Sequence, residues 1–63
     1  MKHRYMCVVY LPDGKTVSQC EGYDTAIEAV VRAREWRKLG YIANAYRNDL
    51  NRDTLELISH PIY

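Results

Sequence analysis

The chain has 63 residues, of which 48% are hydrophobic and 27% charged, a balance typical of folded globular proteins and not of disordered ones. Nine Lys and Arg residues against eight Asp and Glu residues leave a formal net charge of +1, which is too small to predict nucleic-acid binding from bulk electrostatics. No apolar run approaches the ~20 residues of a membrane span, and the start of the chain lacks a signal-peptide cleavage pattern. We therefore expect a single α/β domain over residues 1–63 that works in the cytoplasm, without membrane contact.

The first third of the chain predicts a β-hairpin. Residues 3–11 form an apolar run rich in β-branched and aromatic side chains, and residues 16–22 can return as its partner strand. Between them, Pro-Asp-Gly at 12–14 fits a type I turn closed by a left-handed glycine, which is a three-residue hairpin loop with a bulge.

The length of this loop decides whether Cys7 and Cys20 lie opposite each other in the hairpin. A three-residue loop places Cys7 opposite Gln19, and a two-residue loop places it opposite Cys20; the turn chemistry favours the first. Two cysteines without CxxC spacing do not make a zinc site, so we expect no metal and no cofactor. In a reducing compartment both thiols serve as small apolar side chains.

Residues 24–40 read as one amphipathic helix. Thr25 and Glu28 have the spacing of a capping box at its start, and Gly40 can take the left-handed conformation that ends a helix. A face composed largely of alanines predicts close docking on strands. At 100° per residue this face contains Ala26, Ile27, Ala29, Val30 and Ala33, with Trp36 on its flank.

Two more strands follow the helix. We assign them to residues 41–47 and 54–60, with a loop at residues 48–53 where turn-forming residues gather. Pro61 cannot donate to a strand ladder, so the last strand should lie at a sheet edge. The expected fold is α+β: a two-layer ββαββ domain with a four-stranded antiparallel sheet, strand order 2-1-3-4, and one helix packed on one face.

One helix covers only one face of such a sheet, whereas the first strand is apolar on both. Either the Met6, Val8, Tyr10 set or the Tyr5, Cys7, Val9 set is left facing water, and the sequence does not decide between them. An uncovered apolar face usually marks a contact surface. We therefore expect a homodimer that pairs two uncovered faces, with an open face kept for another partner as the alternative.

The aromatic residues are six tyrosines and one tryptophan, without phenylalanine, a set that favours rings with a polar end and suits a binding surface. Trp36 has two interpretations: a structural contact with Tyr41 at the helix end, or an exposed anchor for a partner. The residues that we predict to bind a partner are Trp36, Arg34, Arg37, Tyr41, Tyr46, Arg47 and Tyr10.

Catalysis needs a nucleophile or an acid and base that converge in a pocket, and the acidic residues here are spread singly over turns and the helix surface. We therefore predict a non-enzymatic protein that binds and regulates or inhibits a protein partner. The alternative is a single-stranded nucleic-acid-binding module in which Tyr46, Arg47 and the helix arginines stack on bases.

Two resemblances accompany this reading. The passage EGYDTAIEAVVRARE after a hairpin resembles the strand-to-helix junction of HicB-type antitoxins, which carries the pattern Gly-x-Asp-Thr-x-x-Glu-Ala. It covers roughly a quarter of the chain and consists mainly of helix-capping residues, and the DNA-binding part of that family has no counterpart here. In size and layout the chain is also similar to the small inhibitor proteins that phages encode against host enzymes, which implies a modulator encoded by a phage or mobile element.

Overall fold

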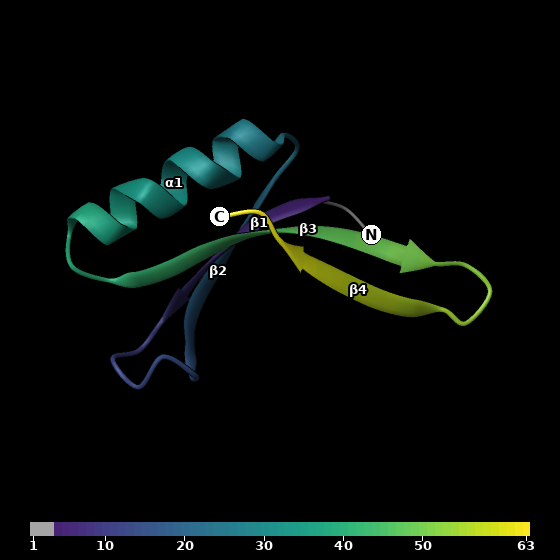
Figure 1. Cartoon of the computed structure of the whole chain (residues 1–63), viewed down its shortest axis with the longest axis horizontal. Coiled ribbons are helices and arrows are strands. Elements are labelled where there is room, and N and C mark those ends of the chain that lie inside the picture. The colour runs from purple at the N-terminus through teal and green to yellow at the C-terminus, as the bar shows by residue number, and fades with distance from the viewer. Residues whose placement is uncertain (1–3) are drawn as a thin grey trace.

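The computed structural model describes residues 4–63, and this part of the chain folds into one helix and one four-stranded sheet (Figure 1). The strands are antiparallel and lie in the order β2-β1-β3-β4, with the helix on one face. This confirms the predicted α+β class, the ββαββ sequence of elements and the strand order. The predicted start of the first strand at residue 3 lies outside the described residues. The elements are β1 (Tyr5–Tyr10), β2 (Val17–Tyr23), α1 (Ala26–Lys38), β3 (Ile42–Asn51) and β4 (Glu56–Pro61).

The start of α1 is fixed by the predicted capping box. Thr25 has an extended backbone, and its hydroxyl oxygen accepts the Glu28 backbone N–H at 3.3 Å. The same hydroxyl donates to the Glu28 carboxylate at 2.8 Å. One backbone N–H of the first turn is thereby satisfied, and the side chains of Thr25 and Glu28 hold each other in place, which confirms the predicted helix start.

The end of α1 depends on Gly40, whose φ of 95° is left-handed. Its N–H donates to the Arg37 carbonyl at 3.0 Å, and the Tyr41 N–H donates to the Trp36 carbonyl at 3.1 Å. These two bonds define a Schellman motif, in which a left-handed residue lets the chain turn back over the last helical carbonyls. The ring centroids of Trp36 and Tyr41 lie 5.1 Å apart at 88°, so the predicted contact at this cap is confirmed.

The core forms where small side chains of the helix meet small side chains of the sheet. Its members are 0–2% exposed, and because alanines face alanines the helix backbone can lie close to the strands. These buried residues are Cys7, Val9, Ala29, Ala33, Ala43 and Ala45. The helix therefore covers the face of β1 that carries Tyr5, Cys7 and Val9, and the Met6, Val8, Tyr10 set faces away from it. The prediction that this second set is left in water is wrong for Val8, which is only 5% exposed between the neighbouring strands.

The placement of Ile27 on the buried helix face is wrong, because its side chain is 76% exposed. The contact with the sheet is centred on Ala29 and Ala33, one turn apart, and Ile27 lies about 100° round the helix from Ala26. An interface this narrow does not extend to it.

The β1–β2 loop is longer than predicted. The Leu11 N–H bonds to the Thr16 carbonyl at 2.8 Å, which leaves residues 12–15 as the loop. Asp13 explains the extra residue, because its carboxylate accepts the backbone N–H groups of Lys15 and Thr16 at 2.8 and 2.9 Å and the Thr16 hydroxyl at 2.6 Å. Gly14, with φ 72°, has the left-handed conformation that the turn chemistry predicts.

Both predicted registers of the hairpin are consequently wrong. Cys7 lies opposite Glu21, and Cys20 lies opposite Val8. An irregularity between Val9 and Tyr10 adds a further shift beyond the longer loop, because Val9 pairs with Gln19 and Tyr10 with Val17. A bulge of this kind has no fixed sequence signal.

The predicted loop at residues 48–53 is also wrong, since β3 continues to Asn51 and the turn occupies residues 52–55. Asn48 lies opposite Ser59, whose hydroxyl donates to the Asn48 side-chain oxygen at 2.6 Å. Polar residues that read as turn formers are thus used as a cross-strand pair. Pro61 ends β4 at a sheet edge, as predicted.

Strand β3 is shared between two neighbours. Ile42–Arg47 pairs with β1, and Tyr46–Asn51 pairs with β4. The outer part of β3 and the facing part of β4 therefore project beyond β1 as a two-stranded ribbon (Figure 1), which we call the arm (residues 49–58). The arm lengthens the molecule to 39 × 24 × 16 Å and exposes the leucines at positions 50, 55 and 57.

Within residues 4–63, α1 falls short of the length and apolarity that crossing a bilayer requires.

Candidate protein-binding site

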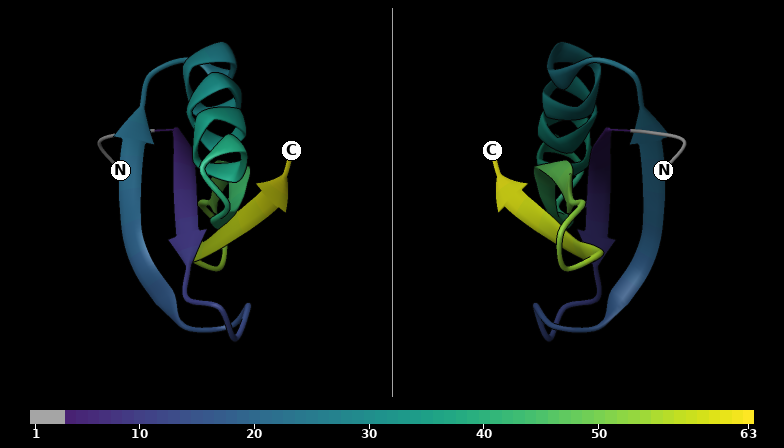
Figure 2. Two further views of the ribbon diagram at one scale, coloured as in Figure 1. Left: turned by 90° about the vertical axis from the view of Figure 1, so that its left-hand side faces the viewer. Right: turned by 90° about the vertical axis from the view of Figure 1, so that its right-hand side faces the viewer.

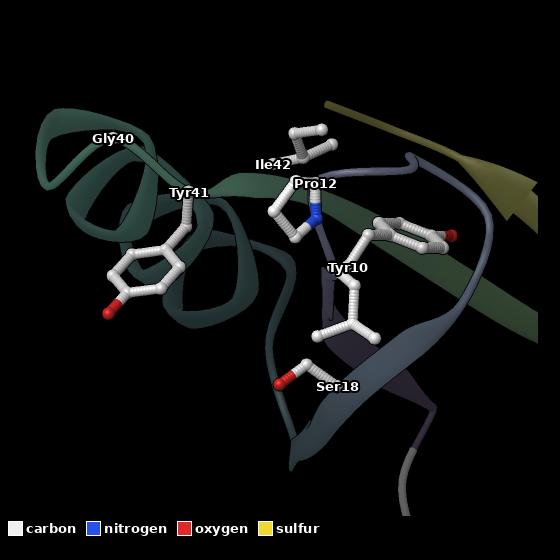
Figure 3. Close-up of a pocket in the computed structure, with 7 residues that line it drawn as sticks. Tyr10, Pro12, Ser18, Gly40, Tyr41 and Ile42 are labelled. Atoms are coloured by element: carbon white, nitrogen blue, oxygen red, sulfur yellow. The ribbon is translucent and has the colours of Figure 1, made fainter.

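An apolar hollow of about 320 Å³ lies where the end of β1 meets the junction of α1 and β3 (Figure 3). Three of its walls are large side chains left in water: Leu11 is 44% exposed, Tyr41 53% and Ile42 42%. Aliphatic and aromatic groups exposed around a concave surface are typical of binding sites. The full lining is Tyr10, Leu11, Pro12, Ser18, Gly40, Tyr41 and Ile42.

The hollow is held by the turn on each side of it. Gly40, in its left-handed conformation, directs the chain away from the helix. Tyr41 and the first residue of β3, Ile42, then form one wall of the hollow. On the other side, the β1–β2 loop approaches the same strand: an added Cβ at Gly14 would lie 3.9 Å from Ile42 Cδ1. The site therefore lies on rigid turns that are themselves fixed by glycine and by Asp13, and not on a long mobile loop.

A hydrogen-bonded network extends the hollow along the sheet face that the helix leaves open. The hydroxyls of Tyr10 and Tyr46 lie 2.7 Å apart, and the Asn44 amide donates to the Tyr46 hydroxyl at 3.2 Å. The bond to Tyr46, with burial as a second cause, raises the pKa of Tyr10 to about 12. We call Tyr10, Asn44 and Tyr46 the tyrosine network. It offers a partner hydroxyl and amide groups beside an apolar cavity.

Arg37 closes the network from the helix side. Its Nε donates to the Ala43 carbonyl at 2.7 Å, and its Nη2 donates to the Asn44 side-chain oxygen at 3.0 Å. The ring of Tyr63 lies under the guanidinium at 4.1 Å, a cation–π distance. Because β4 pairs only from Tyr46 onward, Arg37 caps the stretch of β3 that β4 does not reach.

Trp36 is half-buried and occupied by contacts within the protein. Its indole N–H donates to Glu21 Oε1 at 3.2 Å, and the Arg32 guanidinium lies 4.9 Å from its ring centroid. Its other neighbour is Tyr41, a wall of the hollow. In this position Trp36 supports the hollow from behind without lining it.

The remaining two predicted residues lie elsewhere. Arg34 is exposed on the outer side of α1. Arg47 lies on the helix side of the sheet, opposite to Tyr46, and forms an ion pair with Asp49 at 3.2 Å. Asp49 also contacts His60 at 3.3 Å, so this group forms a separate charged cluster. Of the seven predicted residues, the structure thus brings Tyr10, Tyr41, Tyr46, Arg37 and Trp36 together and leaves Arg34 and Arg47 apart.

Sequence reasoning missed the two aliphatic walls, Leu11 and Ile42. Both were assigned to strands as ordinary members of an apolar alternation. Their signal is position: each stands beside a turn, Leu11 directly before Pro12 and Ile42 two residues after Gly40. At the end of a strand a large side chain has fewer neighbours to cover it.

Both described cysteines have a thiol pKa above the ordinary value. Burial raises the pKa of the Cys7 thiol to about 11, with the Glu21 carboxylate as a second cause, and burial also raises the pKa of Cys20. A nucleophilic cysteine needs the opposite shift. Across residues 4–63, no three His, Cys, Asp or Glu side chains gather in a way that could hold a metal ion.

Comparison with protein-family profiles, with curated proteins and with solved structures finds no match for this chain.

Proposed function

We propose that this chain is a small non-enzymatic protein that binds and regulates a protein partner, and that the apolar hollow receives one side chain of that partner. The hollow itself is the observation that carries the proposal. Its volume of about 320 Å³ is at the small end of the roughly 300–1,000 Å³ of ligand pockets, which suits one anchoring side chain better than a whole cofactor.

The surroundings of the hollow support a protein partner. Anchor side chains bind most tightly in pockets rimmed by groups that exclude water and satisfy nearby polar atoms. Leu11, Tyr41 and Ile42 supply the apolar rim, and the tyrosine network supplies hydrogen-bonding groups next to it. Binding would regulate the partner because the surface that this chain covers is no longer accessible to other molecules.

Single-stranded nucleic acid is a weaker candidate on the same geometry. Stacking of bases needs aromatic rings and cations on one surface. Tyr46 and Arg47 are adjacent in β3 and point to opposite faces, and Arg37 is held by Ala43 and Asn44. Anisotropy of a labelled oligonucleotide tests this alternative, and salt-sensitive micromolar binding would favour it over a protein partner.

The proposal includes the cytoplasm as the place of action. Cys7 and Cys20 are both free thiols, and thiols stay reduced in that compartment.

A displayed library of random peptides tests the hollow directly. The wild-type chain should enrich peptides with a recurrent large apolar residue, because one such side chain enters the hollow. Ile42→Asp places a carboxylate in the wall and should abolish the enrichment, while the control Leu57→Asp, at an exposed position of the arm, should leave it unchanged. Binding that survives Ile42→Asp, or that fails with Leu57→Asp, would overturn the assignment.

The same variants then serve as matched baits in extract of the native host. A partner captured by the wild type and by Leu57→Asp, and lost with Ile42→Asp, is the expected result. Its activity should fall when the purified chain is added.

A further inference from the structure

The two outer strands of the sheet differ in how their free edges are protected. Ala45 exchanges backbone hydrogen bonds with Ile62 and Tyr63, so its backbone groups face β4. Because this direction alternates along a strand, the backbone groups of His60 point toward β3 and those of Pro61 point to the free edge. There the missing N–H of Pro61 removes a hydrogen-bond donor. Where β4 does not reach, Arg37 caps β3 at the Ala43 carbonyl. The free edge formed by β3 and β4 therefore lacks an available backbone group at two places, Pro61 and the Ala43 carbonyl.

The outer edge of β2 carries one such device, the bulge at Ser18, and has none from Gln19 to Tyr23. The Asn48 N–H donates to the Arg4 carbonyl. The backbone N–H and C=O groups of even-numbered β1 residues therefore point toward β3, and those of odd-numbered residues point toward β2. Cys7 then pairs inward with Glu21, and the backbone groups of Cys20 and Gly22 point outward. This strand contains no proline, lysine or arginine, and its outward-turned residues are small. Unpaired N–H and C=O groups in such a row are a template for another strand.

Among residues 4–63, no strand pairs with this edge. The fully buried strand residues under α1 come from β1 and β3, and β2 adds only the half-buried Tyr23 at the margin of this core. Figure 2 shows β2 at the margin of the sheet, with the helix over the strands next to it. A strand that approaches β2 thus meets the backbone without a helix in its way.

We propose that β2 is the contact between two copies of this chain, which pair antiparallel about a two-fold axis at Cys20 and join their sheets into one continuous sheet. The inference is independent of the hollow, because six of the seven residues that line the hollow lie outside β2. It also differs from the expected face-to-face dimer, since it uses the edge of the sheet and leaves the open face free.

The position of Glu21, the charged residue of β2, favours a two-fold axis at Cys20 and a second copy of this chain as the partner. Glu21 is the one charged residue of the strand. An axis at Glu21 would set two carboxylates directly opposite each other, which is unfavourable. An axis at Cys20 sets Glu21 opposite Gln19 of the other copy, twice by symmetry. The three side-chain hydrogen bonds that Glu21 accepts, from Tyr23, Arg32 and Trp36, all use Oε1, so Oε2 is placed to accept the Gln19 amide.

The bulge at Ser18 limits this register to residues 19–22. Beyond it the alternation changes, since Val17 lies opposite Tyr10 on the open face whereas Tyr23 lies opposite Tyr5 on the helix face. A 63-residue domain buries only about 60% of the surface of its unfolded chain, so a shared sheet adds burial where a single copy has little.

Sedimentation equilibrium at tens of micromolar tests the dimer. The wild type should sediment at twice its 7.4 kDa. Cys20→Lys sets two ammonium groups opposite each other and should raise the dimer dissociation constant about tenfold or more. The control Leu57→Lys adds the same charge to the other outer strand and should stay dimeric. A 7.4 kDa wild type, or a dimer that is unaffected by Cys20→Lys, would overturn the proposal.

Disulfide formation with diamide tests the register. Diamide takes up the two electrons and two protons that a pair of thiols releases, and facing residues in a non-hydrogen-bonded antiparallel pair lie about 4.5 Å apart between Cα atoms, within disulfide range. With Cys20→Ser in the background, a mixture of Gln19→Cys and Glu21→Cys chains should cross-link faster than either variant alone. Equal rates in all three samples would contradict an axis at Cys20.

The two assays test the hollow and the β2 dimer independently of each other. Ile42→Asp should remain dimeric in sedimentation while it loses its peptides, and Cys20→Lys should retain the peptides while it loses the dimer. The near-ultraviolet circular dichroism of Trp36 reports whether each variant is folded.

Discussion

Gly40 allows the cost of a backbone conformation to be measured without any change in packing. Its φ of 95° is unfavourable for an L-residue, and a Cβ added there meets no atom within 4 Å. Gly40→Ala should therefore lose stability through backbone strain alone, by about 1–2 kcal/mol in the free energy of unfolding. For a domain of this size each kcal/mol shifts Tm by about 4–8 °C, so we expect Tm to fall by roughly 5–15 °C.

A 63-residue chain can be made by chemical synthesis, which supplies a matched control with D-alanine at position 40. D-Alanine carries the same methyl group and favours positive φ, so it should match glycine or exceed its stability by about 0.4–1 kcal/mol, through a stiffer unfolded chain. Thermal melts at equal concentration compare the three proteins. If the L- and D-alanine variants melt at the same temperature, strain at φ 95° is not what makes glycine necessary there.

Three further predictions concern the helix cap, the tyrosine network and the thiols. Thr25→Ala should lower the free energy of unfolding in urea by about 1 kcal/mol while Thr25→Ser retains it; equal loss in both would remove the role of the hydroxyl. The bond to Tyr46 holds Tyr10 neutral, so its folded pKa of about 12 exceeds the ordinary 10.0: the stabilisation is present below pH 10 and is lost as pH rises through about 12. Tyr46→Phe should lower that pKa in a tyrosinate absorbance titration, and an unchanged midpoint would refute the hydrogen bond as its cause. Cys20 should react with Ellman's reagent in the native protein and Cys7 only on unfolding, so rapid reaction of both would contradict the burial of Cys7.

The helix and the strand order could be predicted because their signals are local. Thr25 and Glu28 specify a helix start within one turn, and Gly40 specifies its end through a backbone requirement that few other residues meet. Four strand-like runs around one helix leave few antiparallel arrangements, and a proline at the last run favours an edge.

The registers could not be predicted because they depend on competing hydrogen bonds. Asp13 binds three groups of the β1–β2 loop and lengthens it, and the bulge near Ser18 shifts the strand again. Likewise, Asn48 reads as a turn residue until Ser59 is placed opposite it. In each case a polar side chain has a local and a long-range use, and the sequence shows only the first.

The covered sheet face was undecided because both faces of β1 are apolar. The deciding residues lie in β3, where Ala43 and Ala45 alternate on one side. Small residues there match Ala29 and Ala33 across the interface, and this complementarity in size is the signal that could have settled the face. The candidate site was predicted in part for a related reason: aromatic and arginine side chains suggest contacts by their type, whereas Leu11 and Ile42 line the hollow only because of where their strands end.

The shared strand β3 also divides the molecule into regions that should open independently. Its first half is bound by β1 and covered by the core, whereas in the arm it has β4 alone, with no helix above it. A two-stranded ribbon outside a core is marginally stable by itself. Amide protons of the arm should therefore exchange with solvent through local fraying, and those of β1 only through global unfolding. Hydrogen exchange would then record two levels of cooperativity along one continuous strand.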